Sequence, residues 1–335
     1  MTARRAGDRS ALTGRRRAGR QVLAVLLATW LCGSWAAQEP AAACPPVAQA
    51  PTPEQLQSAQ SAARDRGFLW RLTRDGHSSW LFGTVHLGRL EWVFPGPALR
   101  EAIGGADLLA LELDITDPAT LREVAAAMAA GPPMPDLPTA VAERLQRQVI
   151  AACLPPQALD GQHPVMRAVT LGLLDARWSG LDPGFAQEGM LAGAARARRI
   201  PIVALEKAAD QIAMLMPPDA ESALGAIESA LAQIESGTSR RAATRLAQAW
   251  ADQRLEELAR YESWCECIAT DTDRAQMERL NDARNPALAD GIAALHAQGR
   301  RVLAAVGALH MTGPQALPRL LEERGFIVER IGFTR

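Results

Sequence analysis

The sequence has little net charge and, beyond its N-terminal segment, no long apolar run. Its 335 residues carry 36 basic and 37 acidic side chains, a formal net charge of −1. This balance argues against a strongly basic nucleic-acid-binding protein, so we expect no nucleic-acid partner. A helix that spans a membrane needs about 20 apolar residues, and no run of about 18 or more occurs after residue 37. We therefore expect no membrane span in the mature chain.

Motifs of several common enzyme classes are also missing. The sequence contains no His-Glu-x-x-His zinc motif, no Gly-x-Ser-x-Gly nucleophile elbow and no phosphate-binding P-loop. Its glycines form no dinucleotide-binding fingerprint. With 48% hydrophobic residues the chain can nevertheless bury a sizeable core, which excludes a disordered protein.

The N-terminus combines an arginine-rich start with a short apolar stretch. Seven arginines lie within residues 1–36, and the apolar stretch at 22–31 is followed by small residues up to Ala37. This order is typical of a secretory signal peptide, with cleavage expected after Ala36. The alternative is an uncleaved anchor helix. We predict a signal peptide over residues 1–36 and a periplasmic or secreted protein.

Four cysteines remain after the predicted signal peptide: Cys44, Cys153, Cys265 and Cys267. An even number suits disulfides in an oxidising compartment, and four cysteines allow three connectivities. The spacing favours a bond between Cys153 and one member of the Cys-x-Cys pair. A metal-binding or redox role for that pair is the alternative, although no second pair completes a cysteine-rich zinc site.

The apolar periodicity predicts an α/β fold. A linker is expected over residues 37–65, which begins rich in alanine and proline, and a folded domain over 66–335. Strand patterns lie at 68–73, 80–85, 108–113, 201–205, 302–306 and 327–331. Helical patterns lie at 97–103, 139–152, 164–176, 185–198, 220–235, 240–264, 271–284, 287–298 and 315–324. We therefore expect a sheet core built from the N- and C-terminal halves, with a helical middle region.

Two histidines follow predicted strands through the same Gly-x-x-His spacing. His86 ends a predicted hairpin that turns at Asp75-Gly76, and His310 follows the strand at 302–306. Open α/β sheets build their sites at strand ends. If both ends of the domain join one sheet, the two histidines lie at neighbouring strand ends. The alternative is a pair of buried, hydrogen-bonded histidines with no chemical role.

Carboxylates accompany two other predicted strands. Glu112 lies inside an apolar run, and Glu206 directly follows the strand at 201–205. A buried carboxylate needs a cation, an arginine or a metal, because an unpaired buried charge is costly. Asp114 is expected on the same face as Glu112. The alternative for Glu112 is an edge strand with its side chain in solvent. Two histidines and a carboxylate would suit a divalent metal with open positions for water.

These motifs resemble those of the TraB/GumN family, also called the Tiki/TraB group. The resemblance spans roughly residues 66–333 and includes both Gly-x-x-His motifs, Leu111-Glu112-Leu113, the segment 184–206 and Arg284-Asn285. It implies a fold like that of erythromycin esterase and the haem-associated ChaN proteins. Animal Tiki members are metal-dependent proteases, and plasmid-encoded bacterial members damp peptide-pheromone signalling. At Val165 this chain departs from many relatives, which have tryptophan after the proline.

The resemblance implies an exported, metal-dependent, peptidase-like hydrolase with a peptide or protein substrate. His86 and His310 would bind Mn, Co or Zn, and Glu112 would be the third ligand or the base. Arg284 would clamp a carboxylate or an oxyanion, with Asn285 assisting and Glu206 as a further catalytic position. One alternative is an exported protein that binds a peptide, haem or metal without turnover. The other is a structural exported domain.

Overall fold

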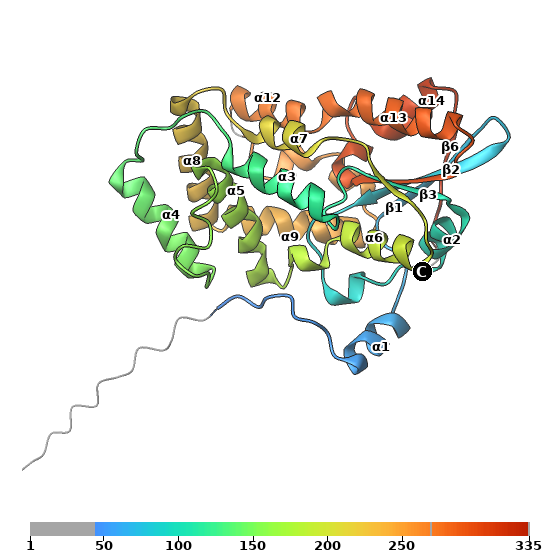
Figure 1. The fold of residues 1–335 in the computed structure, drawn as a ribbon, viewed down its shortest axis with the longest axis horizontal. Coiled ribbons are helices and arrows are strands. Elements are labelled where there is room, and N and C mark those ends of the chain that lie inside the picture. Colours follow the sequence, from blue (N-terminus) through green and yellow to red (C-terminus); the bar gives the residue numbers. More distant parts are fainter. Residues whose placement is uncertain (1–43, 269, 334–335) are drawn as a thin grey trace, which may run out of the picture. The chain divides into compact units, whose positions relative to one another are not determined.

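The computed structural model describes residues 44–268 and 270–333 as an α/β fold (Figure 1). The predicted signal peptide lies outside these residues. The strands are β1 (Phe68–Arg74), β2 (His77–Thr84), β3 (Leu108–Leu111), β4 (Ile202–Ala204), β5 (Val302–Gly307) and β6 (Ile327–Arg330). They form one mixed sheet of six strands in the order β4-β3-β5-β2-β1-β6. Within the described ranges, no helix is long and apolar enough to cross a membrane.

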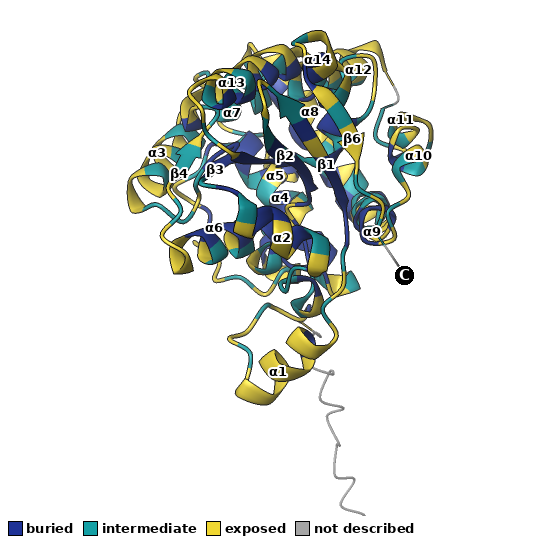
Figure 2. Ribbon diagram, turned by 90° about the vertical axis from the view of Figure 1, so that its right-hand side faces the viewer, coloured by how far each residue is buried: buried dark blue, intermediate teal, exposed yellow. Residues whose placement is uncertain are grey.

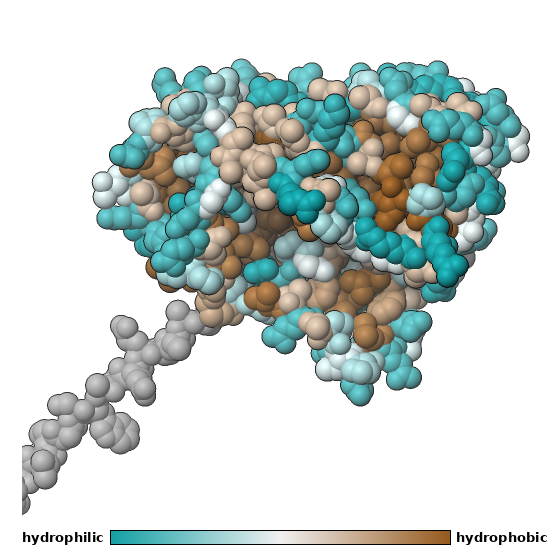
Figure 3. All heavy atoms as spheres, in the orientation of Figure 1, coloured by the Kyte–Doolittle hydropathy of each residue, from teal (hydrophilic) through white to brown (hydrophobic). Residues whose placement is uncertain are grey.

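Helices cover both faces of the sheet. The helices are α1 (Pro53–Ser61), α2 (Pro97–Gly105), α3 (Pro118–Ala129), α4 (Thr139–Ala151), α5 (Pro164–Asp175), α6 (Gln187–Ala197), α7 (Ala208–Leu215), α8 (Ala220–Glu235), α9 (Thr238–Ala251), α10 (Leu255–Leu258), α11 (Tyr261–Trp264), α12 (Asp271–Leu280), α13 (Asn285–Ala297) and α14 (Leu317–Glu323). Figure 2 shows α13 and α14 on one side of the buried strands and α2 and α6 on the other. On the face drawn in Figure 3, hydrophilic side chains dominate the periphery and apolar ones gather toward the middle.

The predicted hairpin is confirmed. β1 and β2 pair antiparallel, and the residues between them, Asp75 and Gly76, have φ values of 51° and 77°. Two consecutive positive φ values fit the twist of a tight hairpin, and Asp-Gly adopts them readily. Strand β6 adds to the free edge of β1.

The two ends of the domain join in one sheet, as the sequence predicts. β2 pairs parallel with β5, with Thr84 opposite Gly307, and β5 pairs parallel with β3, which pairs parallel with β4. Four parallel strands therefore end at the same edge of the sheet. The residues that follow them include His86, Glu112, Glu206 and His310.

A buried tryptophan anchors α9 beneath that edge. The indole N–H of Trp250 donates to the carbonyl of Gly83 at 2.6 Å, and the ring packs against Phe82 and Trp92. Gly67 has a φ of 77°, and a Cβ on it would lie 2.5 Å from the indole nitrogen. Glycine is therefore needed at this position both for the backbone conformation and for the close approach.

A second apolar cluster builds the helical middle region. It joins α4, α5 and α8 through buried side chains that include Leu145, Leu171 and Ile227. Val165, which stands where many relatives have tryptophan, is buried in this cluster. The helix predicted at 220–235 thus packs against neighbouring helices.

The helix predicted over 240–264 is wrong as a single element. The chain forms α9, α10 and α11 instead, because Gln253 takes a left-handed φ of 63° and the Arg254 amide donates to the Ala249 carbonyl at 2.8 Å. This is a helix-ending bond pattern that the apolar periodicity does not reveal. Helices α3 and α7 were not expected either, and α1 lies inside the predicted linker.

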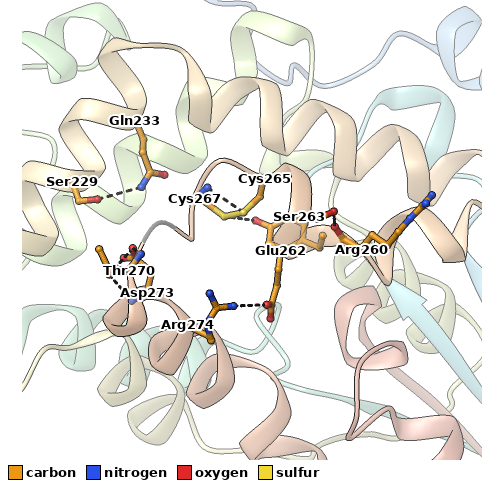
Figure 4. The surroundings of a disulfide bond; sticks show 11 residues. Ser229, Gln233, Arg260, Glu262, Ser263, Cys265, Cys267, Thr270, Asp273 and Arg274 are labelled. Carbon is orange, nitrogen blue, oxygen red and sulfur yellow. Dashed lines mark hydrogen bonds and ion pairs between the residues drawn. A yellow bond between two sulfur atoms is a disulfide. The ribbon is translucent and has the colours of Figure 1, made fainter.

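The expected disulfide between Cys153 and the Cys-x-Cys pair is also wrong. Cys44 bonds to Cys153, and Cys265 bonds to Cys267, with Cα–Cα distances of 5.7 and 5.1 Å. The N-terminal arm supplies the partner of Cys153, at the end of α4. Figure 4 shows the second bond on the loop after α11, beside Glu262 and Ser263.

The two disulfides close loops of very different length, so their removal is expected to have unequal effects. The bonded cysteines are 109 residues apart in one bond and 2 apart in the other. From chain entropy, we expect the Cys44→Ser, Cys153→Ser variant to lose about 3 kcal/mol more free energy of unfolding than the Cys265→Ser, Cys267→Ser variant. Urea unfolding of both variants measures this difference, and equal losses would contradict the prediction.

Candidate functional site

A cavity of about 400 Å³ opens at the carboxyl edge of the parallel strands. Its floor is polar and includes Thr84, His86, Glu112, Arg284 and His310. Its walls are largely apolar and come mainly from α7, α9 and α12, including Ile212, Leu215, Leu246, Met277 and Leu280. The cavity therefore places ionisable groups directly beside an apolar surface.

Gly307, the last residue of β5, is the point on which three predicted site residues converge. A Cβ on Gly307 would lie 3.4 Å from Glu112 Oε1, 3.6 Å from His310 Cδ2 and 3.8 Å from His86 Nε2. The Gly307 amide also donates to Glu112 Oε1 at 2.7 Å. A side chain at this position would fill the space that the three residues share.

Arg284 lies between the buried carboxylate of Glu112 and the partly buried carboxylate of Glu206. Its Nε donates to Glu206 Oε1 at 2.9 Å, and its Nη2 contacts both Glu206 and Glu112. Its Nη1 donates to the Leu280 carbonyl at 2.9 Å and to His310 Nε2 at 3.2 Å. These bonds use all five N–H groups of the guanidinium. Arg284 thus clamps side chains of its own chain, and it has no N–H left for a ligand in this arrangement.

The two carboxylates share a second donor, the amide of Gln211. Its Nε2 lies 3.1 Å from Glu112 Oε2 and 2.7 Å from Glu206 Oε2. Burial raises the pKa of Glu112, but His310, His86 and Arg284 outweigh it and lower this pKa to about 2. Glu112 is therefore ionised at neutral pH. Glu206 does not line the cavity, and it bonds to Arg284 and Gln211, which do.

His310 is buried and held in one tautomer. Asn285 donates through Nδ2 to the Gln315 carbonyl at 2.7 Å, which leaves its Oδ1 to accept from His310 Nδ1. The other ring nitrogen accepts from Arg284. Burial is the largest cause that lowers the pKa of His310, to about 4, so the ring is neutral at neutral pH. Asn285 is fully buried behind this ring, and it positions His310 without lining the cavity.

His86 has a carboxylate partner that the sequence analysis missed. Its Nδ1 lies 3.1 Å from Oε1 of Glu188, in the first turn of α6, and Thr84 Oγ1 donates to the same oxygen. The side chain of His86 is 62% exposed, whereas that of Glu188 is 7% exposed. The charge of Glu188 is the main cause that raises the pKa of His86, to about 9.

Glu188 could have been found from the sequence by one signal. Helix α6 buries Gln187, Glu188, Leu191, Ala192 and Ala195 on one face, and the first two are polar. A carboxylate at a position that the apolar period assigns to the core requires a partner. Its other oxygen, Oε2, is buried and accepts no hydrogen bond from the described residues.

The expected acidic edge of Glu112 and Asp114 does not form. Strand β3 ends at Leu111, and Asp114 turns to Arg196, whose Nη2 donates to its Oδ2 at 2.9 Å. Asp114 also accepts from the amide of Thr116 at 3.0 Å. Only Glu112 of the two lines the cavity.

The donor chemistry of the site suits a metal, but the arrangement does not. Both imidazoles are held through Nδ1, by Glu188 and Asn285, which is the usual way that protein groups orient metal-binding histidines. However, Arg284 covers His310 Nε2 and a Glu112 oxygen, which a metal would need. Among residues 44–268 and 270–333, no group of three or more His, Cys, Asp or Glu side chains could hold a metal. A divalent metal fits only if Arg284 moves.

Replacing Glu188 tests the origin of the His86 charge. In Glu188→Gln, we expect the pKa of His86 to fall from about 9 toward 6.5, measured by NMR titration of its ring protons. Because the folded-state pKa is raised, the pair stabilises the fold fully below pH 6.5, and this stabilisation is lost as the pH rises through about 9. Glu206→Gln, which leaves the His86–Glu188 contact in place, is the matched control. An unchanged His86 titration in Glu188→Gln would contradict this assignment.

Comparison with known proteins identifies a family. A family model described as the TraB/PrgY/gumN family matches residues 68–330. The matched span contains every residue of the cavity floor, from Thr84 to His310. Comparison with curated proteins and with solved structures gives no match.

Proposed function

The chain belongs to the TraB/PrgY/gumN family, and we propose that it is a hydrolase that cleaves peptide-like substrates at the carboxyl edge of its sheet. The observation that carries the proposal is the convergence of His86, Glu112 and His310 on Gly307 beside an apolar wall. Strand ends that meet at one edge are the usual place for a site in an α/β sheet.

His86 is the proposed proton-transfer group. Glu112, with a pKa of about 2, is a weak base at neutral pH, and both ring nitrogens of His310 are occupied by hydrogen bonds. Arg284 stays protonated because Glu206 and Glu112 raise its pKa against the effect of burial. His86 is left with its Nε2, which faces the Gly307 space and has no hydrogen bond to the part of the chain that the structure describes. A histidine oriented through Nδ1 by a carboxylate is an effective general base.

The proposed steps use only the chain's own residues. The unprotonated His86 takes a proton from a water molecule at Nε2, and this water attacks a carbonyl carbon held over Gly307. The fixed charge of Arg284 favours the negative charge that develops on the carbonyl oxygen. The C–N bond of the tetrahedral intermediate then breaks, and His86 gives the proton to the leaving nitrogen, which releases an amine and a carboxylic acid.

A divalent metal remains a separate part of the proposal. The family resemblance suggests Mn, Co or Zn on His86, His310 and Glu112, but this needs Arg284 to leave His310 and Glu112. Binding of a peptide or metal without turnover is the second candidate function, and the apolar wall of the cavity favours peptide binding. Haem binding and the fold likeness to erythromycin esterase and ChaN proteins stay predictions.

We also propose that the protein is exported to the periplasm or secreted. The two disulfides support this, because disulfides persist in oxidising compartments and are rare in the cytosol. The signal peptide proposed over residues 1–36 lies outside the described residues.

Hydrolysis through His86 predicts a particular pH dependence. Because only the unprotonated ring accepts a proton, kcat/KM for a cleaved peptide is expected to rise about tenfold per pH unit up to about pH 9 and then level off. In Glu188→Gln the inflection should move to lower pH, and His86→Ala should lose at least 100-fold in rate. Cleavage that His86→Ala retains would overturn the assignment, and failure to cleave any peptide would favour binding without turnover.

Arg284→Met tests whether arginine and metal compete for the same place. Removing the guanidinium leaves the buried Glu112 and the partly buried Glu206 without their cation, which is destabilising. We expect this variant to bind Co²⁺, Mn²⁺ or Zn²⁺ at least tenfold more tightly than the native chain in calorimetric titration. The metal should also raise the midpoint of thermal unfolding of Arg284→Met by more than it raises that of the native chain. Tight stoichiometric binding by the native chain, unimproved in Arg284→Met, would contradict competition and support a metal-dependent enzyme.

A further inference from the structure

The apolar wall of the cavity is formed by side chains that the fold itself does not cover. Ile212 and Leu215 come from α7, Leu246 from α9, and Met277 and Leu280 from α12. Each of these five side chains is only partly buried, and each borders the cavity. Apolar area of this kind gains free energy when a ligand removes it from water.

A second cavity borders the first. It has a volume of about 410 Å³ and shares Met277, Asn281 and Leu309 with the first cavity. Its lining is more polar and includes Tyr261, Asp282 and Thr312. The loop that carries the Cys265–Cys267 disulfide adjoins this second cavity, because Cys267 Sγ lies 3.5 Å from the hydroxyl of Tyr261.

The two cavities together suit an extended ligand in which apolar and polar groups alternate. A long acyl chain is apolar throughout and would leave the polar groups of the second cavity without partners, which is costly. A peptide has apolar side chains for the first cavity and a backbone of donors and acceptors for the second. The volume of the first cavity, about 400 Å³, is at the small end for ligand sites and suits one or two side chains rather than a large ring.

We propose that α7 and α12 form a subsite for one apolar side chain of an extended peptide, whose backbone then passes over Met277, Asn281 and Leu309 into the second cavity. The proposal rests on the proposed function, since it names the substrate that the site takes. The seated side chain lies against Leu215 and Met277, next to the bond held over Gly307.

The test measures binding separately from cleavage. Acetylated and amidated nonapeptides of glycine and serine, with a single central Leu, Met, Phe, Ser or Asp, are titrated into the His86→Ala chain by calorimetry. We expect the apolar peptides to bind at least tenfold more tightly than the Ser or Asp peptides, the effect of burying a few methylene groups. Equal binding of all five peptides would overturn the subsite.

Variants of the lining residues test where the apolar side chain binds. In the same His86→Ala background, Leu215→Gln and Met277→Gln should each reduce the preference for the apolar peptides over the Ser and Asp peptides to less than threefold. Leu224→Gln, at a partly buried position of α8 outside the cavity, should leave it unchanged. Equal loss in all three variants would overturn the location. As a readout that does not depend on variant folding, a central photoreactive leucine should crosslink to α7 or α12, and crosslinks confined elsewhere would also overturn it.

The outcomes separate the subsite from the hydrolase proposal. Selective binding by His86→Ala, with no cleavage by the native chain, keeps the subsite and overturns hydrolysis. Cleavage by the native chain that ignores the central residue keeps hydrolysis and overturns the subsite. Hydrolysis of 4-nitrophenyl octanoate, with no binding of any peptide, would assign the cavity to an acyl chain and overturn the peptide subsite.

Discussion

The parallel pairing of β2 with β5 is the constraint on which the rest of the structure depends. It places Thr84 opposite Gly307, so two segments far apart in the chain end at the same edge of the sheet. Closing so long a loop costs conformational entropy before any contact is made. The buried residues of both strands, together with β3 on the other side of β5, offset that cost. The two Gly-x-x-His motifs meet only because this pairing forms.

Once the strands are paired, the ionic contacts of Arg284 decide what the site can do. Breaking a buried ion pair by removing one partner costs several kcal/mol, because the other charge is left without compensation. Glu112, Glu206 and Arg284 are therefore held together as a unit, with Gln211 bonded to both carboxylates. A buried carboxylate attracts a cation, and in this chain the arginine supplies it. A divalent metal in this place would have to stabilise the site by more than the five hydrogen bonds that Arg284 already makes.

Much of this site follows from strand patterns, because a strand end has a definite place once the sheet order is known. The apolar runs before His86, Glu112, Glu206 and His310 indicated strands, and the structure puts all four residues at one edge. Glu188 was out of reach of this reasoning, since it enters from the first turn of a helix. The same holds for Leu215 and Met277, which lie on helices whose place over the edge depends on tertiary packing. The Cys44–Cys153 bond depends on the path of the N-terminal arm, which no local pattern describes.

The two histidines show how one motif acquires two chemical roles. Both follow a parallel strand with the same spacing, and in both the Nδ1 atom faces an oxygen. His86 faces the carboxylate of Glu188, so the positive form of the ring is favoured; His310 faces a neutral amide oxygen and is buried beside Arg284, so the neutral form is favoured. Exposure adds to the contrast, since the side chain of His86 is 62% exposed and His310 is buried. These neighbours give His86 a proton that it can exchange and make His310 a fixed hydrogen-bond acceptor. The Gly-x-x-His spacing alone does not distinguish these two roles.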